Sequence, residues 1–217
     1  MFFDNIPAIV SEQSTGASAR GDSCAETARF LYLKLHLDNT ENLPLVNVTS
    51  FRTEKGYVRH PDPMMPLDWR EGDFSCDQAL PLYLTYIMLF PRMAEEMKAR
   101  IQKAGWRTGN GTLISPMFYA ILKGNKFLLN LAVAGQALLF RVPFRWSDSK
   151  KAFESSQDAS GDYLNWWMGA MQASSWARNL VPPSVLISKV EHYYRNEPNN
   201  STILALYSNS IRRTYGF

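Results

Sequence analysis

Residues 115–140 read SPMFYAILKGNKFLLNLAVAGQALLF, and this stretch decides the fold class. It opens with Ser115-Pro116, a helix N-cap followed by the proline that favours the first helical position. Gly124-Asn125 is a turn signal between two apolar runs. The second run is too short to cross a membrane, which takes about 20 apolar residues. The stretch therefore predicts two buried helices joined as an α-hairpin.

Helical periodicity with start and stop signals recurs along the chain. The predicted helices cover residues 23–38, 75–103, 115–123, 127–140, 162–178, 184–195 and 201–213. Pro91 is expected to kink or split the second of them. Strand content should be small, with at most one short hairpin between Val46 and Val58. We expect an all-α single domain at 21–217, with about seven helices stacked as α-hairpins, and an extended arm at 1–20.

Composition narrows the classes of function. The net charge is only +3 and the basic residues are scattered, so we expect no nucleic-acid partner. Cys24 and Cys76 form no CxxC pair and the three histidines no HExxH pair, so we expect no metal site. No Walker loop or GxGxxG word supports a cofactor. The N-terminus lacks the pattern of a secretory signal, so we expect a cytoplasmic protein without a membrane span.

Two predicted helices begin alike, with Ser23-Cys24-Ala25-Glu26 and Ser75-Cys76-Asp77-Gln78. Both motifs fit a capping box, in which the side chain of the fourth residue, Glu26 or Gln78, accepts a hydrogen bond from the backbone amide of the serine. The starts also carry the acids Asp22 and Asp77, and Gly161-Asp162 is expected to open a third helix in the same way. If these helix starts share a rim, their dipoles would hold several carboxylates ionised at one end of the bundle.

A long, proline-rich connection separates the first two predicted helices, and loops of this length are often functional. It holds Arg59, His60, Asp62 and Trp69, which combine a cation, an imidazole, an acid and an indole. These side chains would form one wall of a cleft. Two structural alternatives remain open, a simple turn at Pro61-Asp62 and an ion pair between Arg59 and a helix-start acid.

Adjacent tryptophans occur on the helix expected to begin at Asp162. Neighbouring helical residues point about 100° apart, so Trp166 and Trp167 cannot both face one interior. One of the two is therefore expected to be a partly exposed platform that stacks on a sugar ring or a partner protein, and Trp166 is the candidate for this role. The alternative is that both rings are core.

Four short segments of the sequence resemble those of uncharacterised bacterial and phage proteins, whose helices begin with similar Gly-Asp-Ser and Ser-x-Asp-Gln motifs. The segments are Gly21-Asp22-Ser23-Cys24-Ala25-Glu26-Thr27-Ala28-Arg29, Arg59-His60-Pro61-Asp62, Trp69 and Phe74-Ser75-Cys76-Asp77-Gln78. The helix-start acids are also similar to those of (α/α)-toroid enzymes, which cleave glycans on one face of the ring. A full toroid has about twelve helices, so the resemblance implies a partial toroid.

The leading hypothesis is a protein that binds or cleaves glycans. As an enzyme it would be a glycoside hydrolase or polysaccharide lyase, with Asp22 and Asp77 as acid and base and His60 as proton shuttle. The substrate-binding residues would be Arg59, Asp62, Trp69 and Trp166, with Arg59 as the clamp for an acidic sugar. The alternative is a non-enzymatic phage virion protein that assembles as a homo-oligomer or with other virion proteins.

Overall fold

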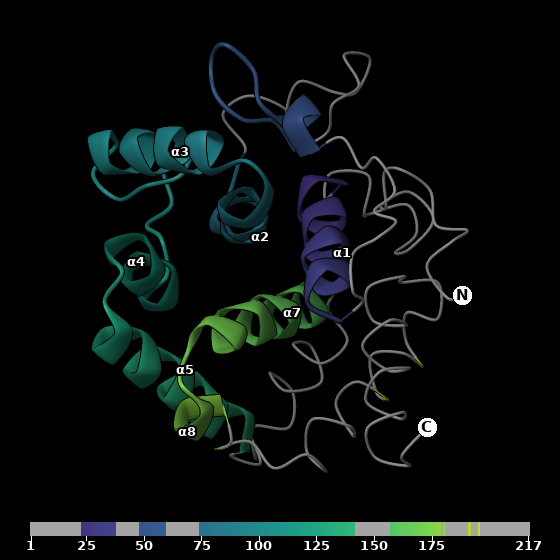
Figure 1. Ribbon diagram of the computed structural model, residues 1–217, viewed down its shortest axis with the longest axis vertical. Coiled ribbons are helices and arrows are strands. Elements are labelled where there is room, and N and C mark those ends of the chain that lie inside the picture. Colours follow the sequence, from purple (N-terminus) through teal and green to yellow (C-terminus); the bar gives the residue numbers. More distant parts are fainter. Residues whose placement is uncertain are drawn as a thin grey trace.

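The computed structural model describes residues 23–37, 48–59, 74–141 and 157–178, together with Leu180, Glu191 and Arg195. Within these residues the chain forms seven α-helices, one 3-10 helix and two isolated β-bridges, and no strand (Figure 1). The helical elements are α1 (Ser23–Leu37), η2 (Val48–Phe51), α2 (Cys76–Leu89), α3 (Pro91–Lys103), α4 (Pro116–Lys123), α5 (Lys126–Arg141), α7 (Gln157–Gln172) and α8 (Ser175–Arg178). The all-α prediction is confirmed.

Helices α2 and α7 hold the fold together. Helix α2 packs against α1, α3 and α7, and α7 also contacts α1, α4, α5 and α8. In Figure 1, α7 crosses the middle of the molecule, with α1 and α2 above it and α5 and α8 below. Residues 78–86 of α2 are all buried, so this helix presents apolar side chains on every face, as a central core helix must.

Polar side chains of α2 are satisfied by carbonyl groups of neighbouring elements. The Thr85 hydroxyl donates to the carbonyl of Ala28 at 3.0 Å, and the Tyr86 hydroxyl donates to that of Val48 at 2.9 Å. A buried hydroxyl without a partner costs about 1–3 kcal/mol, so these two bonds favour one placement of α2 against α1 and η2.

The predicted helix pair at 115–140 is confirmed as α4 and α5, which pack against each other. Ser115 caps α4 by accepting the Phe118 amide at 3.2 Å. Gly124 ends α4 with φ of 63°, a left-handed conformation that glycine adopts at little cost. The Asn125 side chain then caps the next helix by accepting the Leu128 amide at 3.0 Å.

Two predicted helices are divided. Residues 75–103 form α2 and α3, because Phe90 leaves the helical conformation and Pro91 takes the first position of α3, where its missing N–H is no loss. The segment predicted at 162–178 forms α7 and α8. Helix α7 begins earlier, at Gln157, so the prediction that Gly161-Asp162 opens a helix is wrong. A glycine inside a helix costs only about 1 kcal/mol relative to alanine, and packing compensates for it.

The short hairpin expected between Val46 and Val58 reduces to η2 and a single bridge between Arg52 and Tyr57. The turn closes with the Thr53 amide donating to the Gly56 carbonyl at 2.7 Å. The predicted arm at 1–20 and the helix at 201–213 lie outside the described residues.

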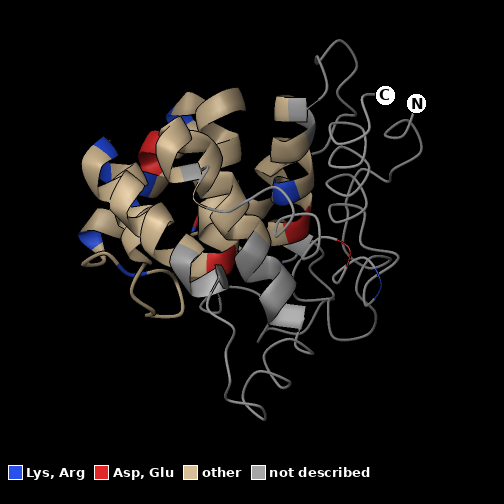
Figure 2. Ribbon diagram, turned by 90° about the horizontal axis from the view of Figure 1, so that it is seen from below, with Lys and Arg blue, Asp and Glu red and all other residues tan. Residues whose placement is uncertain are grey.

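Charge is unevenly distributed over the helices. Most of the helical ribbon in Figure 2 is tan, meaning neither acidic nor basic. Helix α2 contains one charged residue, Asp77, whereas α3 alternates charges along its sequence PRMAEEMKARIQK. Among the described residues, no helix has both the length and the apolar character that crossing a membrane requires.

The start of α2 generates a stability prediction. The Ser75 amide donates to Oε1 of Gln78 at 2.9 Å, which is the bond that the Gln78 side chain makes in the predicted capping box. Replacing Gln78→Ala should lower the free energy of unfolding by about 0.5–2 kcal/mol, measured by chemical denaturation. Gln102→Ala, an exposed position on α3, should change it by less than about 0.5 kcal/mol. Equal effects would contradict the cap.

Candidate functional site

Four polar side chains from α1, α2 and α7 form a chain of contacts that we call the Asp77 network. The Arg29 guanidinium contacts Oε1 of Glu26 at 2.6 Å and donates through Nε to Oδ1 of Asn165 at 3.1 Å. The Asn165 amide in turn points its Nδ2 at Oδ1 of Asp77, 3.4 Å away. The network therefore links an anion, a cation, an amide and a second anion in sequence.

Burial separates the members of this network. Glu26, Arg29 and Asn165 have only 4%, 3% and 6% of their surface exposed, while Asp77 is exposed. A buried ion pair loses its hydration, so its charges depend on each other and on added hydrogen bonds. Asn165 supplies such a bond to Arg29. The result is a fixed polar structure in the core with one carboxylate at the surface.

The exposed end of the network is suited to recognise hydroxyl groups. An ionised carboxylate accepts hydrogen bonds at two oxygens, and Asn165 restrains one of the Asp77 oxygens. The other oxygen remains available to a ligand hydroxyl. Because Asn165 is itself anchored on Arg29, the orientation of Asp77 is set by residues that a ligand does not touch.

Of the residues predicted to line a cleft, Asp77 and Arg59 are described. The backbone carbonyl of Arg59 accepts the amide of Cys24 at 2.9 Å, so Arg59 lies at the start of α1, near Glu26 in the helix sequence. The backbone of Arg59 therefore adjoins the first turn of α1, the helix that carries Glu26 and Arg29. The remaining predicted residues, Asp22, His60, Asp62 and Trp69, lie outside the described residues.

The prediction that Trp166 is an exposed platform is wrong. Trp166 is 1% exposed, and its Nε1 donates to the carbonyl of Val133 in α5 at 3.2 Å. Its neighbour Trp167 is half-buried and packs at the edge of the core. The angular argument that the two rings face different ways holds, but the packing of α7 on α5 turns Trp166 inward.

Sequence reasoning missed most of the network. The sequence predicted a capping box between Ser23 and Glu26, but it did not predict the ion pair between the Glu26 carboxylate and Arg29, three residues later. The spacing of an acid and a base on one face of a largely apolar helix was the available signal. Asn165 gave no such signal, because its partners lie on other helices.

A pocket with a volume of about 300 Å³ lies elsewhere, between α2, α3 and two loops. Its described lining includes Phe74, Ala79 and Arg100 but neither Asp77 nor Arg59, the two predicted cleft residues that the structure describes. In the described part of the chain, no three His, Cys, Asp or Glu side chains are arranged to hold a metal ion, and Cys24 and Cys76 are not joined by a disulfide.

The described residues thus define an all-α domain whose central helix starts at an exposed, anchored carboxylate. No protein family, no curated protein and no solved structure matches the chain. The resemblance to bacterial and phage proteins and to (α/α)-toroid enzymes therefore stays a prediction.

The buried ion pair gives a second stability prediction. Arg29→Met should lower the free energy of unfolding by about 3–5 kcal/mol, because it leaves the Glu26 carboxylate buried without its cation. Adding Glu26→Met to the same chain should recover part of that loss, since no lone buried charge remains. Both are measured by chemical denaturation.

The matched control is the ion pair between Arg52 and Glu96, which are 2.7 Å apart with side chains 48% and 52% exposed. Arg52→Met should cost less than about 1 kcal/mol, because water screens an exposed pair. Similar decreases in the free energy of unfolding for Arg29→Met and Arg52→Met would show that the buried ion pair stabilises the protein no more than the exposed one.

Proposed function

We propose that the protein binds a glycan at the surface where α2 begins, with Asp77 as the central acceptor of sugar hydroxyl groups. The observation that supports this is the Asp77 network, which holds an exposed carboxylate in place from the core. Sugars are recognised by fixed carboxylate and amide groups, because each hydroxyl both donates and accepts a hydrogen bond. Pre-positioned polar groups reduce the ordering cost of binding.

Binding is better supported than cleavage. Glycoside hydrolysis needs two carboxyl groups on either side of the scissile bond, about 5–10 Å apart. The second carboxylate of the network, Glu26, is buried and paired with Arg29, so it cannot reach a substrate. Cleavage by a hydrolase or lyase mechanism would depend on Asp22, the partner predicted from the sequence.

Arg59 extends this proposal to acidic sugars. Its backbone is fixed to the first turn of α1, the helix that carries Glu26 and Arg29, and its side chain is half-buried. A guanidinium group pairs with a carboxylate through two parallel hydrogen bonds. We propose that Arg59 contacts the carboxylate of an acidic sugar while Asp77 accepts from its hydroxyls.

The test is titration calorimetry of the wild type and Asp77→Asn against a panel of acidic and neutral oligosaccharides. The amide keeps the shape and an oxygen that can accept from Asn165, but it loses the negative charge. Loss of a charge-assisted hydrogen bond should weaken binding about 10- to 100-fold without changing the melting temperature.

Glu95→Gln removes an exposed carboxylate from α3 and serves as the matched control, which should bind like the wild type. Absence of binding by the wild type across the whole panel would remove the glycan proposal. Equal affinities of the wild type and Asp77→Asn would show that the glycan binds elsewhere than at the start of α2.

Assembly with further copies or with virion proteins is the second candidate function. Three large apolar side chains on α5 and α8 are exposed: Phe127 at 74%, Leu131 at 49% and Trp176 at 53%. Phe127 and Leu131 are four residues apart and so share one helix face, and α8 packs on α5. Exposed apolar groups of this kind favour contact with another protein surface.

Light scattering across a range of protein concentrations tests this candidate. If α5 mediates assembly, the wild type should be oligomeric and Phe127→Lys should reduce the measured mass towards that of one chain. Leu113→Lys changes an equally apolar residue that is 57% exposed outside these helices, and it should leave the mass unchanged. A wild type that stays monomeric throughout would rule out assembly of copies through this face.

A further inference from the structure

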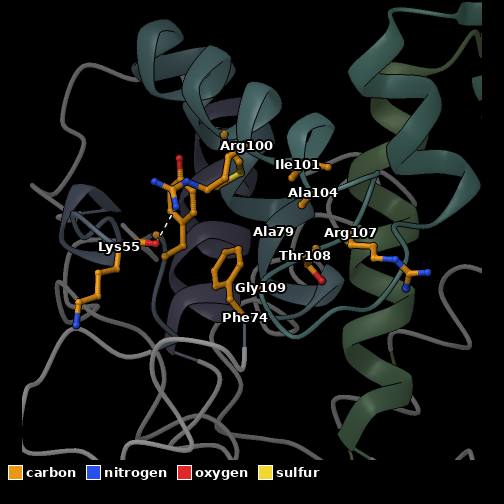
Figure 3. Close-up of a pocket in the computed structure, with 12 residues that line it drawn as sticks. Lys55, Phe74, Ala79, Arg100, Ile101, Ala104, Arg107, Thr108 and Gly109 are labelled. Carbon is orange, nitrogen blue, oxygen red and sulfur yellow. Dashed lines mark hydrogen bonds between the residues drawn. The ribbon is translucent and has the colours of Figure 1, made fainter.

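The pocket between α2 and α3 has a buried floor and an exposed rim (Figure 3). Five of the six buried residues that line it are hydrophobic and form the floor, namely Tyr57, Phe74, Ala79, Met97 and Ile101; the sixth is Thr108. The volume of about 300 Å³ lies at the lower end of the range for sites that enclose small molecules. The cavity is thus large enough for an aromatic ring or a short branched aliphatic chain.

Basic residues lie around the mouth of the pocket. Lys55, Arg100 and Arg107 are exposed residues of the lining, and none of the lining residues that the structure describes is acidic. The side chains of Lys55 and Arg107 extend away from the cavity, so Arg100 is the cation at its mouth (Figure 3). The nearest acids on α3 have other partners, since Glu96 pairs with Arg52 at 2.7 Å and Glu95 lies 3.6 Å from Lys98. The pocket therefore combines an apolar interior with the Arg100 guanidinium at its mouth.

The Arg100 side chain is held at the mouth of the pocket by a hydrogen bond. Its Nη1 donates to the carbonyl of Lys55 at 2.7 Å, drawn as a dashed line in Figure 3. This acceptor is neutral, and no acidic partner of Arg100 occurs among the residues that the structure describes. The guanidinium keeps its charge and several donors for a ligand.

Tyr57 adds a hydroxyl beside this guanidinium. Burial raises the pKa of Tyr57 to about 12, although the charge of Arg100 lowers it. The hydroxyl therefore stays protonated at neutral pH and can donate a hydrogen bond.

Backbone contacts fix both loops that wall the pocket. On one side, the Asn110 amide donates to the Phe74 carbonyl at 3.2 Å, and Gly109 approaches so closely that a Cβ there would lie 3.2 Å from Cβ of Phe74. On the other, Arg100 anchors the turn that carries Lys55. A cavity with walls held in this way loses little entropy when it is filled.

We propose that this pocket binds a small organic carboxylate, with the apolar body on the floor and the carboxylate at Arg100. The charge of Arg100 favours an anion over a neutral or cationic molecule of the same shape. A singly charged carboxylate suits the site better than a phosphate, because Arg100, Ile101 and Ala104 come from the C-terminal end of α3. That end of a helix has negative dipole potential, whereas phosphate sites use helix N-termini.

The test compares three probes that share one body, 4-phenylbutyrate, 4-phenylbutanol and 4-phenylbutylamine. Their dissociation constants for the wild type are measured by amide chemical-shift titration in NMR. We expect the carboxylate to bind about five- to tenfold more tightly than the alcohol, and the amine to bind most weakly. Equal affinity for the carboxylate and the alcohol would overturn the proposal.

Two variants locate the ligand. Arg100→Gln should abolish the preference for the carboxylate over the alcohol, whereas Lys103→Gln, on the same helix but outside the lining, should keep the preference. Ala104→Trp should block all three probes from an exposed rim position, whereas Ala99→Trp, exposed but outside the lining, should not.

Retention of the carboxylate preference in Arg100→Gln, or unchanged binding in Ala104→Trp, would show that the probe binds elsewhere. Neither result depends on the glycan proposal, because the pocket lining excludes Asp77 and the other members of its network.

Discussion

Helix α2 is enclosed by three other helices, and residues 78–86 leave no face of it in contact with water. A helix in this position cannot leave polar groups unpaired, because there is no solvent to replace a missing partner. Thr85 and Tyr86 therefore bond to carbonyls of α1 and η2, and Gln78 bonds to the amide that precedes the helix. The hydrogen bonds that the polar groups of buried helix α2 require thus fix the positions of the neighbouring elements.

The same burial explains where the polar surface features lie. Asp77 is the last residue of α2 before the buried run begins, so its carboxylate lies where the N-terminal end of the central helix reaches solvent. The pocket occurs where α2 meets α3, a short, charged helix whose apolar residues point towards α2 and whose cations point outward. Both proposed sites are therefore consequences of how α2 is covered.

Two arginines show how burial changes the role of a side chain. Arg29 is enclosed with Glu26 and Asn165, and these partners use its charge and donors inside the core. Arg100 is exposed and bonds to a neutral carbonyl, which leaves its charge available. Arg29 is thus a structural residue that orients others, while Arg100 is suited to meet a ligand.

The sequence by itself determined the all-α class and the local ends of several helices. The caps at Ser75 and Ser115, the turn at Gly124 and the break at Pro91 were predictable because they depend on residues within one helical turn. Tertiary structure decided what those helices present to each other. The burial of Trp166 and the contact of Arg29 with Asn165, which is 136 residues away in sequence, depend on which faces pack together. Periodicity shows that a helix has an apolar face, but only packing selects the partner of each polar side chain.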